Sequence, residues 1–107
     1  MIKANLTRHN GHHSISVTGH ANYAPHGSDI VCAGVSTLMH AVLTQSLETG
    51  ANVTVRSNLT EIHFEVDKKT MNKDDYHLIK LWEMVRNTLK DMEEQYPENV
   101  MLILSEE

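Results

Sequence analysis

Residues 19–33, GHANYAPHGSDIVCA, decide the fold because they join a predicted strand to a predicted helix. Before them, residues 14–18 alternate polar and apolar side chains, which is typical of a strand with one buried face. After them, apolar side chains recur at helical spacing. A proline and a glycine indicate an irregular loop, and either Ser28 or Asp29 is a good N-cap for the helix that follows. This connection contains the side chains best suited to chemistry, a cysteine and two histidines.

Cys32 is the one cysteine of the sequence. If Asp29 is the N-cap, Cys32 is the third helical residue, where unpaired backbone N–H groups and the positive end of the helix dipole favour a thiolate. His20 ends the preceding strand and could take the thiol proton or form an ion pair with the thiolate. The alternative is that Cys32 is a small buried hydrophobic residue.

Composition sets broad limits on the protein. The 107 residues are 40% hydrophobic, so we expect a single domain, residues 1–107, with one core. The net charge of −5 argues against direct nucleic acid binding. No apolar run approaches membrane-spanning length and the N-terminus lacks a signal-peptide core, so we expect no membrane partner and a cytoplasmic protein. A free reactive thiol also survives best in a reducing compartment.

A hairpin is predicted at the start of the chain. Asn10-Gly11 is a strong two-residue turn signal between two alternating segments. With that turn, Leu6 faces Ile15 and Ala4 faces Val17, so both strands agree on one buried face.

Three histidines, His9, His12 and His13, surround this turn. A metal site is possible, but adjacent residues of a strand point to opposite faces, which separates His12 from His13. We therefore interpret all three as solvated turn residues.

The helix that carries Cys32 is predicted to run from about Ile30 to Thr49, with Gly50 as its C-cap. Its apolar side would be formed by Leu38, Val42, Leu43 and Leu47. A second hairpin follows, with a turn near Asn58 and Val55 paired with Ile62.

A second, longer helix is predicted to begin at Asn72, with Asp75 in its first turn, and to end before Pro97. Its core stripe would consist of Leu78, Leu81, Trp82, Val85, Leu89 and Met92. Residues 100–104 are apolar on both faces, which suits a central strand or a strand covered on its second face by another subunit.

These elements predict an α+β, two-layer domain. It contains a sheet of about five strands in the order β-β-α-β-β-α-β, with two helices on one face. The order of the strands within the sheet is not specified by these patterns.

The motif Gly19-His20-Ala21, followed by Gly27-x-Asp29-Ile30-Val31-Cys32-Ala33-x-Val35-Ser36, resembles the signature of the ribosomal-processing cysteine protease family Prp. The resemblance implies a cytosolic, homodimeric endopeptidase that removes a short N-terminal extension from a large-subunit ribosomal protein. Its partner would be that precursor peptide, and no metal or other cofactor would be needed.

The same resemblance implies a role for each motif residue. Cys32 would be the nucleophile and His20 the general acid and base, with Asp29 and Ser36 in support. The substrate loop would include Ala21, Asn22, Tyr23 and Gly27. Backbone N–H groups at the helix N-terminus would be natural donors to the oxyanion.

Two other classes of function stay open at this point. One is a metal-binding module built from Cys32, His20 and His26, although their spacing matches no tight ligand pattern. The other is a non-catalytic binding protein of ribosome assembly in which Cys32 is structural.

Overall fold

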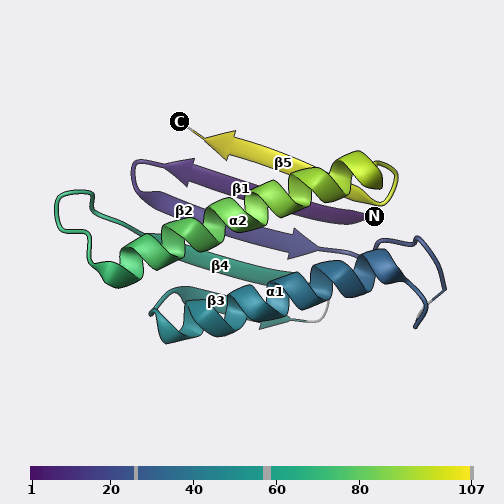
Figure 1. Cartoon of the computed structure of the whole chain (residues 1–107), viewed down its shortest axis with the longest axis horizontal. Helices are drawn as coiled ribbons and strands as arrows, with labels where there is room; N and C mark the ends of the chain where they lie inside the picture. Colours follow the sequence, from purple (N-terminus) through teal and green to yellow (C-terminus); the bar gives the residue numbers. More distant parts are fainter. Residues whose placement is uncertain (26, 57–58, 107) are drawn as a thin grey trace.

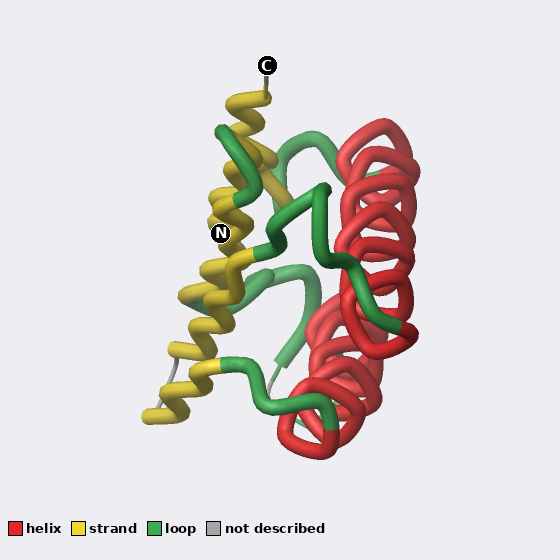
Figure 2. The backbone as a smooth tube through the Cα atoms, turned by 90° about the vertical axis from the view of Figure 1, so that its left-hand side faces the viewer, coloured by secondary structure: helices red, strands yellow, loops and turns green. Residues whose placement is uncertain are grey.

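A five-stranded sheet and two helices form two layers in the computed structural model, which describes residues 1–25, 27–56 and 59–106. Both helices cover the same face of the sheet, and the other face is open (Figures 1 and 2). The elements are β1 (Ile2–His9), β2 (His12–Thr18), α1 (Ile30–Glu48), β3 (Asn52–Arg56), β4 (Leu59–Glu65), α2 (Lys73–Gln95) and β5 (Val100–Glu106). The predicted fold class and element order are confirmed.

The strands lie in the order β3-β4-β2-β1-β5. β1 pairs in parallel with β5, and the other neighbours are antiparallel. The first and last strands are therefore adjacent. Because β5 is an edge strand, the alternative in which residues 100–104 form a central strand is wrong, and Ile103 on the open face is 49% exposed.

The first hairpin has the predicted register, with Leu6 opposite Ile15 and Ala4 opposite Val17. Asn10 and Gly11 adopt φ angles of 49° and 82°, as a two-residue hairpin turn requires. A Cβ at Gly11 would collide with the carbonyl oxygen of Val66. The turn therefore needs glycine both for its backbone conformation and for close packing.

The second hairpin has a different register from the predicted one. Val53 faces Ile62, and Val55 faces Thr60. A shift of two residues keeps the same side chains on the same face, so alternation could not distinguish the two registers. The turn predicted near Asn58 lies outside the described residues.

Helix α1 buries a stripe at helical spacing, and the membership of this stripe differs from the prediction. The buried residues are Val31, Val35, Met39, Val42 and Ser46. Leu47 is exposed, because it lies about 100° around the helix from Ser46. Thr49 is the C-cap, and Gly50 follows it with φ of 82°.

By length and a mean hydropathy of 1.5, α1 could also cross a membrane, contrary to the expectation that no segment reaches that length. Core helices of soluble proteins can have the same length and mean hydropathy, and the buried stripe of α1 packs on the sheet here.

Helix α2 begins as predicted. Asn72 and Asp75 form a reciprocal capping box in which each side chain accepts the other's backbone N–H. Leu78, Trp82, Val85 and Leu89 are fully or nearly fully buried, and the helix ends at Gln95, two residues before Pro97.

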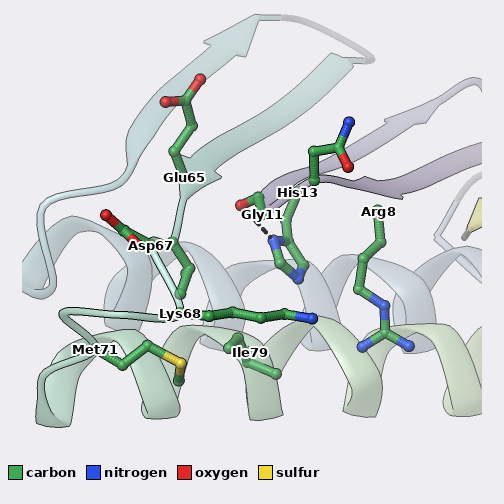
Figure 3. A pocket seen from close by; sticks show the side chains of 10 residues that line it. Arg8, Gly11, His13, Glu65, Asp67, Lys68, Met71 and Ile79 are labelled. Carbon is green, nitrogen blue, oxygen red and sulfur yellow. Dashed lines mark hydrogen bonds between the residues drawn. The ribbon is translucent and has the colours of Figure 1, made fainter.

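His13 is buried, so the interpretation of all three turn histidines as solvated is wrong for this one. It is only 4% exposed, because it lies on the inner face of β2 between Phe64 and Trp82. Its ring stacks on Phe64 at 4.6 Å and meets Trp82 edge-on at 5.7 Å. Nδ1 donates to the carbonyl of Gly11 at 3.0 Å, beside a cavity of about 1120 Å³ (Figure 3).

Candidate active site

The loop from β2 to α1 begins with a glycine that no other residue could replace without strain. Gly19 has φ of 90°, and a Cβ there would collide with the carbonyl oxygen of Met1 at the start of β1. This close approach fixes the backbone directly before His20.

Asp29, one of the two predicted candidates, is the N-cap of α1. One carboxylate oxygen accepts the N–H of Cys32 at 2.9 Å. The other accepts the N–H groups of Tyr23 at 2.9 Å and Ala24 at 3.3 Å. The Cys32 N–H lowers the pKa of the Asp29 carboxyl most, desolvation opposes it, and the Tyr23 and Ala24 bonds lower it further. Asp29 therefore joins the loop to the helix.

Cys32 and His20 line the same cavity, whose volume is about 210 Å³. Ser36, one helical turn after Cys32, lines it too, and residues of β1, β2 and β4 complete its wall. Cys32 is a free, partly buried thiol at the third position of α1. The predicted pair is thus brought to one hollow at the start of the helix.

Two N–H groups in the first turn of α1 are already hydrogen-bonded and cannot serve as the expected oxyanion donors. The N–H of Cys32 is bound by the Asp29 side chain, and the N–H of Ala33 donates to the Asp29 carbonyl at 3.0 Å. The prediction is therefore wrong for these two groups, because the capping residue satisfies them first.

Residues of the predicted substrate loop differ in exposure. Asn22, Tyr23 and Gly27 are exposed, whereas the side chain of Ala21 is buried at 1% exposure. Asn22 has φ of 54°, which turns the chain after Ala21. A bound peptide could reach the side chains of Asn22 and Tyr23 and the backbone of Gly27, but not the side chain of Ala21.

Two residues next to this loop were not predicted from sequence. The Asn99 side chain donates to the carbonyl of Ala21 at 2.9 Å, and the ring of Tyr96 meets that of Tyr23 edge-on at 5.3 Å. Both belong to the connection between α2 and β5. No local pattern marks them, because their proximity depends on the position of β5 in the sheet.

The structure does not support the alternative of a metal-binding module. Among the residues that it describes, no group of three or more His, Cys, Asp or Glu side chains could hold a metal ion. His26, which belongs to the alternative metal set, lies outside those residues.

A sequence model of the family "Cysteine protease Prp" matches residues 1–101. The chain belongs to the Prp cysteine protease family. It is therefore a cysteine protease, which confirms the resemblance and argues against a non-catalytic binding protein. Because most of the chain is matched, the relation does not depend on the loop motif alone.

Curated Prp proteins from two bacteria are similar to this chain. The ribosomal processing cysteine protease Prp of Staphylococcus aureus is 29% identical over 89 residues, which cover 82% of each chain. The protein of that name from Bacillus subtilis is 49% identical over 41 residues, which span 36% of this chain and 37% of that protein.

Solved structures share the fold. The Prp protease of S. aureus in complex with a covalently linked product peptide superposes with a TM-score of 0.77 at 25% identity, over 97% of this chain and 99% of that one. A Streptococcus mutans protein gives a TM-score of 0.70 at 30% identity, over 100% and 96% of the two chains.

Proposed function

We propose that this Prp protease acts in ribosomal processing and removes a short N-terminal extension from a large-subunit ribosomal protein precursor. The relatives from S. aureus and B. subtilis are named ribosomal processing proteases. The S. aureus structure with a covalently linked product peptide supports a peptide as the partner. We also propose that the enzyme works in the cytoplasm, where it would meet the precursor during ribosome assembly.

The nucleophile in this proposal is Cys32 and the general acid and base is His20. The observation that carries the assignment is their common cavity at the N-terminus of α1. A cysteine protease needs a thiol, and the sequence contains one cysteine. Among the described residues no hydrogen bond joins the two side chains, and such contacts often tighten only when substrate binds.

The reaction proceeds in two halves. His20 takes the thiol proton of Cys32, the thiolate adds to the scissile carbonyl carbon, and the C–N bond breaks as protonated His20 gives that proton to the leaving amine. His20 then takes a proton from water, and the resulting hydroxide attacks the thioester. The C–S bond breaks to release the carboxylic acid product, and the Cys32 thiolate takes the proton back from His20. The positive end of the α1 dipole stabilises the oxyanion in both halves.

Asp29 and Ser36 support the pair in different ways. Asp29 holds the backbone of Cys32 and the loop in one arrangement. Ser36 contributes a hydroxyl to the cavity wall. Asn22, Tyr23 and Gly27 would contact the peptide at the outer side of the loop.

A homodimer completes the proposal. Met101 and Ile103 project from the edge strand β5 onto the open face of the sheet, and both are exposed. A second copy would cover this apolar strip.

The proposal is tested by replacing the pair. Cys32→Ser and His20→Ala should each abolish trimming of a synthetic peptide that spans the precursor cleavage site. Because the two groups act as one unit, the double variant should be about as inactive as the worse single variant. His40→Ala removes an exposed histidine from the same helix and should leave trimming unchanged.

Circular dichroism should show that all four variants are folded. Substantial trimming by Cys32→Ser would remove Cys32 from the mechanism, and trimming at the wild-type rate by His20→Ala would do the same for His20.

A further inference from the structure

The loop that carries the proposed site residues is tied to a part of the chain far away in sequence. Asn99 Nδ2 donates to the carbonyl oxygen of Ala21 at 2.9 Å. The rings of Tyr96 and Tyr23 lie 5.3 Å apart at an interplanar angle of 79°. Figure 1 shows the α2–β5 connection and the β2–α1 loop at the same end of the sheet. Two contacts thus hold the loop within three residues of His20.

Asn99 is fixed by its own backbone, independently of its side chain. Its N–H donates to the carbonyl of Tyr96 at 2.9 Å, and its carbonyl accepts the N–H of Ile2 at 2.8 Å. These bonds would survive a substitution at position 99. Replacing Asn99 therefore removes the bond to Ala21 and leaves the connection in place.

The acceptor of this bond directly follows His20. The side chain of Ala21 is buried, and its carbonyl would lose a hydrogen-bond partner if Asn99 were truncated. At the other side of the loop, the backbone of Tyr23 is held by Asp29. The peptide unit that follows Ala21 is thus fixed by Asn99, and the ring of Tyr23 is oriented by Tyr96.

We propose that Asn99 and Tyr96 are positioning residues of the protease. Asn99 fixes the backbone after His20 and so directs the imidazole toward Cys32. Tyr96 holds the exposed ring of Tyr23 where it forms a wall for the peptide. This inference rests on the proposed function, since it assigns His20 to proton transfer and Tyr23 to peptide binding.

The two residues should affect different kinetic constants. Asn99→Ala should lower kcat by roughly tenfold to a hundredfold with little change in KM, because a displaced acid–base group slows the chemical step. Asn99→Asp has the same size but no N–H donor, and its carboxylate would face a carbonyl oxygen, so it should lose at least as much. Asn87→Ala changes an exposed asparagine of α2 and serves as the control.

Tyr96 allows a similar comparison. Tyr96→Phe keeps the ring and should leave both constants unchanged. Tyr96→Leu removes the edge-on contact with Tyr23 and should raise KM severalfold at nearly constant kcat.

A readout without substrate separates this inference from the proposed function. Amide hydrogen exchange at Tyr23 and Ala24 should accelerate in Asn99→Ala and stay unchanged in Asn87→Ala. If the wild-type enzyme failed to trim the precursor, the proposed function would fall and the exchange result would still show whether Asn99 orders the loop.

The inference is overturned if Asn99→Ala keeps wild-type kcat or wild-type exchange. It is also overturned if Asn99→Asp matches the wild type, or if the loss of kcat equals a loss of folded protein measured by thermal unfolding.

Discussion

Asp29 accepts a hydrogen bond of 2.9 Å from the backbone N–H of Cys32. The proposed nucleophile is therefore anchored by the residue that caps its helix. Because the second oxygen of the same carboxylate accepts the N–H groups of Tyr23 and Ala24, one side chain holds both the loop and the first turn of α1.

Asp29→Asn should separate these two tasks. Asparagine caps helices as well as aspartate, so α1 should stay intact. Its amide NH₂ cannot accept the N–H groups of Tyr23 and Ala24, so the loop should loosen. We expect a folded protein with a clearly reduced trimming rate, and Asp29→Ala should additionally lower the thermal unfolding temperature. Wild-type activity in Asp29→Asn would show that the loop bonds are dispensable.

Gly19→Ala should impair both stability and trimming. The substitution combines an unfavourable positive φ, which costs about 1–2 kcal/mol, with a collision against Met1. Gly50→Ala is the matched control, because Gly50 has a similar φ of 82° and an added Cβ there meets nothing within 4 Å. Denaturant unfolding should show a larger loss for Gly19→Ala, and equal losses would mean that the Met1 contact relaxes freely.

His13 should make stability depend on pH. Burial lowers the pKa of His13 below its ordinary value of 6.5, with Arg8 and His12 acting in the same direction and the Gly11 bond and Glu83 opposing. The unfolded chain therefore binds a proton before the folded one, and the free energy of unfolding should fall as pH drops below about 6.5. The fluorescence of buried Trp82 can report the transition.

His13→Phe is the comparison for that measurement, because it keeps an aromatic ring between Phe64 and Trp82. Its free energy of unfolding should decline less steeply between pH 6.5 and 5. Parallel profiles for the two proteins would show that His13 does not titrate in this range.

Ile103→Lys should weaken the proposed dimer. A charge in the middle of the exposed apolar strip would be costly to bury against a second copy. Sedimentation at micromolar concentration should show a shift from dimer to the 12.1 kDa monomer. Thr54→Lys, on the exposed far strand β3, should leave the assembly unchanged. A monomeric wild-type protein would refute the dimer itself.

Features that depend on residues close together in the chain were predicted correctly from the sequence. The Asn10-Gly11 turn determined the first register, and Asn72 with Asp75 marked the start of α2. Features set by distant partners were missed. His13 is buried because Phe64 and Trp82 pack around it. The edge position of β5 could not be distinguished from a central one because the side chains on its open face are also apolar.

The residues of the candidate site show the same difference between local signals and distant contacts. Cys32, His20 and Asp29 lie within one loop and its flanking elements, so spacing and capping chemistry brought them together. Asn99 and Tyr96 reach that loop only because β5 returns beside β1. No pattern in residues 96–99 could reveal such a contact without the order of the strands.

The pairing of β1 with β5 has a consequence for biosynthesis. During translation the first strand leaves the ribosome long before its parallel neighbour exists, since Ile2 pairs with Val100. One edge of β1 stays open until residues 100–106 have emerged, and contacts of such long sequence separation form slowly. Nascent chains of this protease should therefore acquire the complete sheet, and with it the Asn99 anchor of the loop, only after β5 has emerged.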